Sequence, residues 1–146
     1  MKILILGAGR VGSSLASTLS KQDYEVSIVD LNKDKLLRLQ EDYDLATEIG
    51  HASHPITLEK AGADEETIVL AVTNSDECNI ASCQIAKAKF NVKKTICRLS
   101  DSSYFESLGA FGEDNIDIAI GPENEVTEHL VDLIKHPGAE QIESFA

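Results

Sequence analysis

The sequence predicts an α/β fold in which helices cover both faces of a doubly wound, six-stranded parallel sheet. Six short apolar runs alternate with helical patterns along the 146 residues. Several runs are continuously apolar, as strands buried on both faces require. The glycine-rich segment 7–12 follows the first run, and Asp30 closes the second run eighteen positions after Gly12. Right-handed crossovers between such units give the strand order 3-2-1-4-5-6.

Each apolar run has the length of a strand and ends at turn-forming or polar residues. The expected strands are Lys2–Leu6, Val26–Val29, Leu45–Ile49, Ile68–Val72, Thr95–Leu99 and Ile116–Ile120. Apolar spacing predicts a first helix through Val11, Leu15 and Leu19, a second through Leu36, Leu37 and Leu39, and a sixth through Val126, Leu130, Leu133 and Ile134.

The remaining helices are predicted from their ends. Asn32 is the expected N-cap of the second helix, and Ser75 or Asp76 that of a fourth helix over 76–90. Pro55 fits the first turn of a short third helix, which Gly62 ends. Ser100 or Asp101 opens the fifth helix.

Each glycine of segment 7–12 has its own physical role. Gly7 permits the tight turn out of the strand, Gly9 lets backbone approach a pyrophosphate, and Gly12 lets the helix pack closely on the sheet. The helix N-terminus offers amide groups and partial positive charge to phosphates. With Asp30, the pattern is the dinucleotide-binding fingerprint of a Rossmann-like fold. A turn without a ligand explains one glycine, but not three glycines and an acid.

Further candidates follow the first two strands, because ligands of this fold bind beyond the carboxyl ends of the strands. Arg10 is either a clamp on a ligand phosphate or a solvated loop residue. Asp30 can accept both hydroxyls of an adenosine ribose, or it can cap the next helix. Its charge would repel a 2′-phosphate and so favours NAD over NADP, an inference that Lys33 and Lys35 weaken.

The other strand ends supply four more candidates. His51 can contact the adenine or be a simple loop residue, and Thr73 and Asn74 can bind ribose or phosphate or cap the fourth helix. Arg98 is a candidate for a terminal phosphate, with a surface salt bridge as the alternative.

Composition restricts the partners and the compartment. The net charge of −12 disfavours nucleic acid and anionic membranes as partners. The first apolar run is too short for a signal peptide, and none approaches membrane-spanning length, so a cytoplasmic protein is expected. Three cysteines without a Cys-x-x-Cys spacing are expected to be reduced. His51 and His54 lack the further ligands of a metal site.

Several catalytic motifs are missing from the sequence. It has no Tyr-x-x-x-Lys pair, no P-loop and no Gly-x-Ser-x-Gly elbow. We therefore predict a binding domain that is not an enzyme. The main alternative is the cofactor-binding domain of an NAD-dependent dehydrogenase. A redox-sensing transcription regulator is disfavoured by the acidic charge and by the lack of a helix-turn-helix segment.

The last residues depart from the strand-helix alternation. His136-Pro137-Gly138 breaks the pattern, and residues 141–146 begin an alternating, strand-like stretch. We expect a nucleotide-binding domain over residues 1–135, and the start of a truncated C-terminal regulatory domain over residues 136–146.

Several segments resemble a known family. The segments that carry the resemblance are 2–12, Asp30, 50–55, 61–64 and 71–77. In these segments the chain is similar to the TrkA family, the cytosolic regulatory subunits of bacterial Trk potassium-uptake systems, whose unit is the KTN domain or RCK N-lobe. The resemblance implies a regulator that binds NAD or NADH and ATP or ADP. It also implies a homo-oligomer, a dimer or a tetrameric ring, held at the inner face of the membrane by a potassium transporter.

The resemblance also implies roles for individual residues. Phosphates would be held by Gly7, Ala8, Gly9, Arg10 and Val11, the adenosine ribose by Asp30, and the distal half of the ligand by Thr73 and Asn74. Arg98 would recognise phosphate, on its own ligand or on that of a neighbouring subunit. On this basis we hypothesise that Arg98 discriminates ATP from ADP. Many KTN domains carry Gly-Asp where this chain has Gly50-His51, so the acidic contact of that loop does not carry over.

Overall fold

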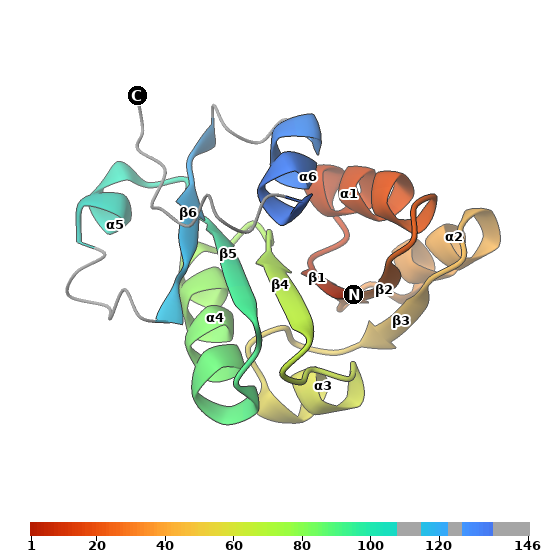
Figure 1. The fold of residues 1–146 in the computed structure, drawn as a ribbon, viewed down its shortest axis with the longest axis horizontal. Coiled ribbons are helices and arrows are strands. Elements are labelled where there is room, and N and C mark those ends of the chain that lie inside the picture. The colour runs from red at the N-terminus through yellow and green to blue at the C-terminus, as the bar shows by residue number, and fades with distance from the viewer. Residues whose placement is uncertain (108–114, 123–126, 136–146) are drawn as a thin grey trace.

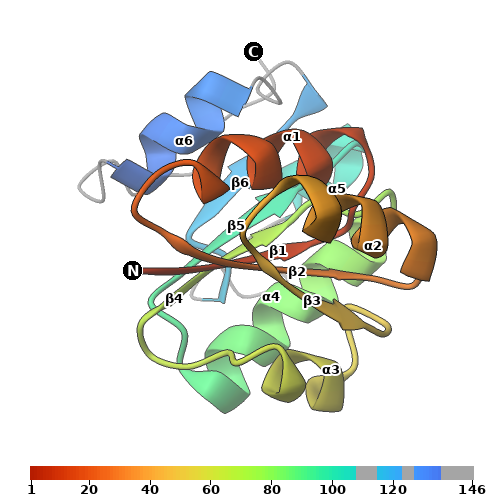
Figure 2. The same cartoon turned by 90° about the vertical axis from the view of Figure 1, so that its right-hand side faces the viewer.

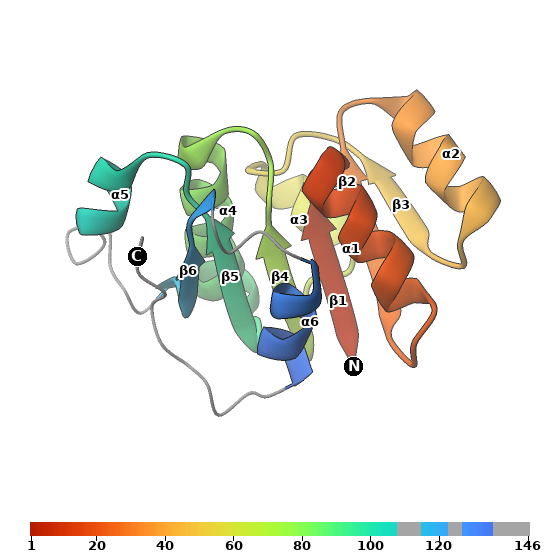
Figure 3. The same cartoon turned by 90° about the horizontal axis from the view of Figure 1, so that it is seen from above.

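A six-stranded parallel sheet forms the centre of the computed structural model, which describes residues 1–107, 115–122 and 127–135. The strands are β1 (Lys2–Leu6), β2 (Glu25–Asp30), β3 (Ala46–Ile49), β4 (Thr67–Ala71), β5 (Lys94–Arg98) and β6 (Ile118–Ile120). They lie in the order β3-β2-β1-β4-β5-β6 (Figure 3), and every neighbouring pair is parallel. The predicted fold class and strand order are confirmed.

Helices cover both faces of the sheet. One layer consists of α1 (Arg10–Ser20), α2 (Lys33–Asp42) and α6 (Thr127–Lys135), and the opposite layer of α3 (Pro55–Lys60) and α4 (Asp76–Phe90). Figure 2 shows the sheet between these two layers. The short helix α5 (Ser102–Glu106) lies beyond the β6 edge of the sheet (Figure 1).

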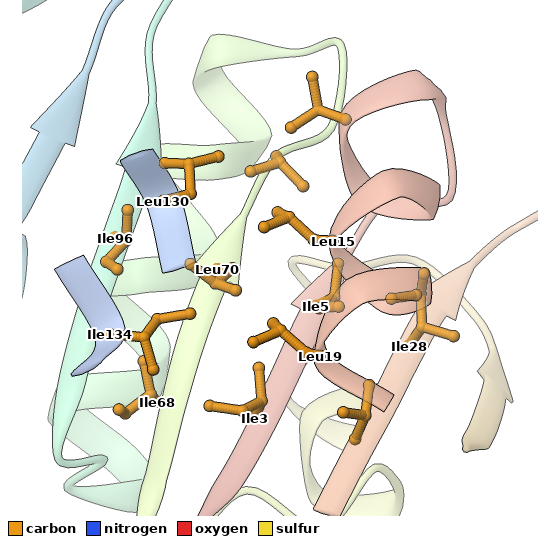
Figure 4. Packing of buried hydrophobic residues seen from close by; sticks show 14 of the residues in the cluster. Ile3, Ile5, Leu15, Leu19, Ile28, Ile68, Leu70, Ile96, Leu130 and Ile134 are labelled. Atoms are coloured by element: carbon orange, nitrogen blue, oxygen red, sulfur yellow. The ribbon is translucent and has the colours of Figure 1, made fainter. Parts of the chain in front are cut away.

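The continuous apolar runs are explained by burial on both faces. In β1, Ile3 and Ile5 pack beneath α1 and α6, while Leu4 and Leu6 belong to the cluster beneath α3 and α4. Figure 4 shows the first cluster, which contains Leu15 and Leu19 of α1 together with side chains of β1, β2, β4 and β5. Since successive strand residues point to opposite faces, a strand between two helical layers must be apolar throughout.

Only the bounds of β1 agree with the prediction, because strand ends follow backbone pairing rather than hydropathy. β2 extends one residue further at each end, to Glu25 and Asp30, and β3 begins at Ala46 instead of Leu45. β4 and β5 begin and end one residue earlier than predicted, since each starts with a buried polar residue, Thr67 or Lys94. β6 begins at Ile118 instead of Ile116. The carboxylate of Asp117 accepts a hydrogen bond from the amide of Thr95 at 2.8 Å. This amide is therefore not available for a backbone hydrogen bond to a longer β6.

The predicted helix ends are also present. Asn32 Oδ1 accepts the amide of Lys35 at 3.1 Å, and Ser75 Oγ accepts that of Cys78 at 3.1 Å, so Asn32 and Ser75 are the N-caps of α2 and α4. Gly62, just after α3, has a φ of +88°. In α2 the side chain of Leu37 is exposed. Val126 and the second domain expected at 136–146 lie outside the described residues.

The remaining expectations concern thiols, metals and membrane segments. Cys78, Cys83 and Cys97 are free thiols, and the pKa of Cys83 is raised by a hydrogen bond with Cys97 and by burial. The described residues contain no cluster of three potential metal ligands. Within the same residues, no helix combines the length and the apolar character needed to cross a bilayer.

Candidate nucleotide-binding site

A cavity of about 660 Å³ lies beyond the carboxyl ends of β1 to β4. Its walls come from the loops after these four strands and from the first turns of α2 and α4. The lining residues are Gly7, Gly9, Val29, Asp30, Leu31, Lys35, Gly50, His51, Ala52, Ser53, Val72, Thr73, Asn74, Ser75, Glu77, Cys78 and Ala81. The cavity therefore occupies the place where the strand order reverses, which is the ligand crevice of doubly wound sheets.

The glycine loop has the backbone geometry that its sequence predicts. Gly7 has a φ of +109°, and its amide donates to the carbonyl of Val29 at 2.8 Å. A Cβ at Gly12 would overlap the carbonyl oxygen of Gly7, so only glycine allows α1 to approach β1 this closely. A Cβ at Gly9 would meet nothing within 4 Å. The space beside Gly9 is thus open, as the close approach of a pyrophosphate requires.

The amino end of α1 faces the same loop. Gly9 is the N-cap of α1, and no side chain caps the helix. The first turn contains no acidic residue that would neutralise its partial positive charge. Because the first amides of a helix have no intrahelical partner, this end favours an anionic group such as a phosphate.

Asp30 joins the glycine loop to the start of α2. Its Oδ2 accepts the amide of Ala8 at 2.7 Å, and its Oδ1 accepts the amide of Asn32 at 2.8 Å. Asp30 is therefore not the N-cap of α2, a role that Asn32 fills. Each carboxylate oxygen has a further lone pair, so the fixed carboxylate can still accept ribose hydroxyls at the cavity wall.

The adjoining wall mixes apolar and imidazole groups. Leu31 lines the cavity although 67% of its surface is exposed, and Val72 lines it from the end of β4. The rings of His51 and His54 stack with centroids 4.5 Å apart, and His51 Nδ1 lies 3.0 Å from Ser53 Oγ. A flat base can pack against such a wall while its edge binds polar groups.

Asn79, on α4, organises the loop after β4. Its Oδ1 accepts the amide of Thr73 at 3.0 Å and the hydroxyl of Thr73 at 2.6 Å. Its Nδ2 donates to the carbonyls of Thr73 at 3.1 Å and Arg98 at 2.9 Å. The side chain is fully buried. Asn79 thus fixes the ends of β4 and β5 relative to α4, and nothing in the apolar pattern signals it.

We expect Asn79→Ala to lower the free energy of unfolding by about 3 kcal/mol, because the change leaves several buried backbone groups unsatisfied. Urea denaturation monitored by circular dichroism measures the loss. Asn74→Ala is the matched control, since Asn74 is exposed in the same loop. Equal stabilities of the two variants would contradict the role given to Asn79.

The first turn of α4 connects the cavity to α5. Asp76 Oδ1 and Oδ2 accept the amides of Ser100 and Asp101, both at 2.9 Å. Glu77, which lines the cavity, accepts the phenolic O–H of Tyr104 at 2.8 Å. This hydrogen bond holds the pKa of Glu77 below its ordinary value of 4.5 and raises the pKa of Tyr104. Glu77 is therefore ionised at neutral pH.

Removing the phenolic hydroxyl in Tyr104→Phe is expected to raise the pKa of Glu77 toward 4.5. A depressed carboxyl pKa in the folded state stabilises the fold above the unfolded pKa, and this contribution disappears as the pH falls through the folded pKa. The loss of stability below about pH 5, as the pH falls through the folded pKa of Glu77, should thus be smaller in the variant. Carboxyl-detected NMR titration measures the pKa directly, and an unchanged Glu77 pKa would contradict the assignment.

The predicted site residues fall into three groups. Gly7, Gly9, Asp30, His51, Thr73 and Asn74 line the main cavity. Ala8, Gly9 and Arg10 line a smaller, adjoining depression. Val11, Gly12 and Arg98 line neither. Val11 is buried, and Arg98 Nη1 donates to the carbonyl of Thr73 at 3.2 Å and to Asn74 Oδ1 at 3.4 Å.

Comparison with known proteins places the chain in a family. Residues 3–122 match the TrkA-N domain. The chain is 45% identical over its full length to the Trk system potassium uptake protein TrkA of Vibrio alginolyticus, and 40% identical over 99% of its length to that of Halomonas elongata. It spans about a third of each relative, 32% in both cases.

Solved structures share the fold at low sequence identity. The NAD-bound GsuK channel superimposes with a TM-score of 0.65 at 19% identity, over 82% of this chain and 21% of the channel chain. The AMP-bound Kef C-terminal domain of Shewanella denitrificans gives 0.59 at 19% identity, over 94% and 93% of the two chains. With the family match over residues 3–122 and the identity to Trk proteins, the chain belongs to the TrkA-N domain family.

Proposed function

We propose that this chain is a nucleotide-sensing domain that regulates a membrane potassium transporter. The observation that carries the proposal is the cavity at the reversal of strand order, where the glycine loop and the Asp30 carboxylate meet. An anion-favouring loop beside a hydroxyl-accepting acid suits the phosphates and the ribose of a nucleotide.

The proposed ligands are NAD or NADH and ATP or ADP, bound in the same cavity. They share an adenosine with at least two phosphates, and the cavity offers a partner for each part. The amino end of α1 faces the phosphates, Asp30 the ribose, and Leu31 with His51 the adenine. The fold neighbours with bound NAD and bound AMP support this ligand class.

Thr73 and Asn74 are proposed to contact the distal half of the ligand. Thr73 is held by Asn79, and Arg98 lies against both residues of the loop. The distal wall is therefore built from polar groups that already have fixed partners. We propose that Arg98 acts on phosphate from this position, directly or through the loop that it braces.

The transporter partner is proposed from the relatives, whose names place them in the Trk potassium-uptake system. In this proposal the domain acts at the inner face of the membrane, as part of a homo-oligomer. A ligand shifts such an assembly only by binding one of its states more tightly than another. Regulation without catalysis is favoured over a dehydrogenase cofactor domain because these relatives are Trk proteins, although dehydrogenases share the fold.

Calorimetric titration with NAD, NADH, ATP and ADP tests the binding proposal. We expect all four to bind with one site per chain, and each to displace the others, because they share the adenosine subsite. Failure of every nucleotide to bind would overturn the proposal. Binding of NAD and ATP at independent sites would contradict the shared cavity.

The same titrations on Arg98→Ala test the phosphate role of this residue. We expect the ratio of ATP affinity to ADP affinity to fall about fivefold, because the variant loses a cation that attracts the extra negative charge of a triphosphate. Lys89→Ala, at the far end of α4, controls for the loss of one positive charge. An unchanged ATP/ADP ratio in Arg98→Ala would refute the hypothesis.

A further inference from the structure

A second, smaller depression adjoins the nucleotide cavity between the start of α1 and α2. It has a volume of about 340 Å³ and is lined by Ala8, Gly9, Arg10, Ser13, Lys35, Arg38 and Leu39. Gly9 and Lys35 also line the main cavity. Because the two spaces share these walls, a substituent on a nucleotide in the main cavity can extend into the depression.

The charge of the depression is opposite to that of the whole chain. Among the described residues, its seven lining residues include three cations and no carboxylate, although the sequence contains 25 acidic and only 13 basic residues. Lys35 and Arg38 are exposed, and neither forms an ion pair within the described residues. The positive charges of Lys35 and Arg38 are therefore not neutralised by an ion pair with a described residue.

Helix geometry directs these cations toward α1. Lys35, Arg38 and Leu39 are spaced i, i+3 and i+4 and so share one side of α2. Leu39 packs in the core that α1 also contacts, and Arg10 is the first residue of α1. Like charges at this spacing repel each other on a helix surface. A bound anion would relieve that repulsion.

We propose that the depression is an anion subsite that takes a terminal phosphoryl group carried by the bound nucleotide. The proposal rests on the nucleotide binding proposed above. Guanidinium groups bind phosphate oxygens in pairs, and an ammonium group supplies a further charge-assisted bond. Arg10 and Arg38 with Lys35 provide these groups from two helices.

The position of the depression favours the ribose as the source of this phosphate. Lys35 lies in the first turn of α2, whose N-cap Asn32 donates its amide to Asp30, the proposed ribose ligand. Arg98, in contrast, lies at the end of β5. A 2′-phosphate, as in NADP or NADPH, would thus reach the cations, whereas the terminal phosphate of ATP is the second possible source.

Asp30 alone argues against a 2′-phosphate, and its charge led us to expect NAD rather than NADP. The structure changes this balance in two ways. Both oxygens of Asp30 accept backbone amides, which partly offset its charge. Three cations also line the adjacent depression. The site therefore has an acceptor for a ribose with a free 2′-hydroxyl, Asp30, and cations for a ribose with a 2′-phosphate.

Arg38→Gln tests the subsite, because Arg38 lines only the smaller depression. Affinities for NAD, NADP, ADP and ATP are measured by calorimetry for the wild type and the variant. We expect the NADP/NAD affinity ratio to fall about fivefold, the effect of removing one charge near a phosphate at the surface. Lys33→Gln is the matched control, since Lys33 lies on the same helix but lines neither cavity.

The two ligand pairs distinguish the sources of the phosphate. A selective fall in the NADP/NAD ratio supports the subsite and assigns it to the ribose, and a selective fall in the ATP/ADP ratio supports it and assigns it to the terminal phosphate. Unchanged ratios, or equal falls in Lys33→Gln, overturn the subsite while leaving nucleotide binding intact. A wild-type chain that binds none of the four ligands overturns the proposed function and the subsite together.

Discussion

Gly12→Ala is expected to lower the free energy of unfolding by about 3 kcal/mol or more. The new Cβ would overlap the carbonyl oxygen of Gly7 and lie 2.8 Å from its carbonyl carbon. Both are backbone atoms, so no rotamer change relieves the contact. Gly7 is itself held at a φ of +109° by its hydrogen bond to Val29. The helix must therefore move away from β1, and the buried residues of α1 lose contacts in the core.

Gly9→Ala is the control for this prediction. A Cβ at Gly9 meets nothing within 4 Å, and the residue has extended backbone angles. The stability of the Gly9→Ala variant in urea should remain close to that of the wild type. The affinity of this variant for nucleotides should fall, since the methyl group would lie where a pyrophosphate approaches. Gly12→Ala with wild-type stability would contradict the packing argument, and Gly9→Ala with wild-type affinity would contradict the position given to the phosphates.

Asp30→Ala is expected to weaken NAD, NADH, ATP and ADP together, by about thirtyfold or more. Hydrogen bonds to a charged group contribute about 1.5–3 kcal/mol each, and all four ligands carry the same adenosine ribose. The variant also loses the acceptors of the Ala8 and Asn32 amides, so the glycine loop loses its connection to α2. Calorimetry with each ligand measures the change.

Two controls separate binding from folding in this experiment. Asp34→Ala removes one negative charge from an exposed position of α2 that lines neither cavity, and it should bind all four ligands as the wild type does. Thermal unfolding without ligand shows how much of the effect of Asp30→Ala comes from the loop. Loss of NAD binding alone, with ATP and ADP unaffected, would contradict a shared ribose subsite.

The fold could be predicted because its determinants are local and repetitive. Strands between two helical layers must be apolar on both sides, so β1 and β4 are visible as continuous runs. The turn at Gly7 and the close approach at Gly12 each require glycine, which makes the first strand-helix connection specific. Short parallel strands with right-handed crossovers then leave few arrangements.

The site could be predicted only in part, because its walls depend on side-chain directions in three dimensions. Gly9, Asp30 and His51 follow strands and line the cavity as expected. Arg10 begins α1 and Arg98 ends β5, but Arg10 lines the smaller depression and Arg98 turns toward the loop after β4. Asn79 is one polar residue inside a helix, and its partners lie six and nineteen positions away. No periodic pattern reveals such a group.

The hydrogen bonds of the first turn of α4 link nucleotide binding to the binding of any protein surface at α5. Glu77 belongs to the cavity wall and accepts the hydroxyl of Tyr104, while the adjacent Asp76 holds the amides of Ser100 and Asp101. A nucleotide that alters the hydrogen bond of Glu77 thereby alters the free energy of α5 in its present position. Coupling between two sites is reciprocal. A protein surface that moves Tyr104 must therefore change nucleotide affinity by the same factor by which the nucleotide changes the affinity for that surface.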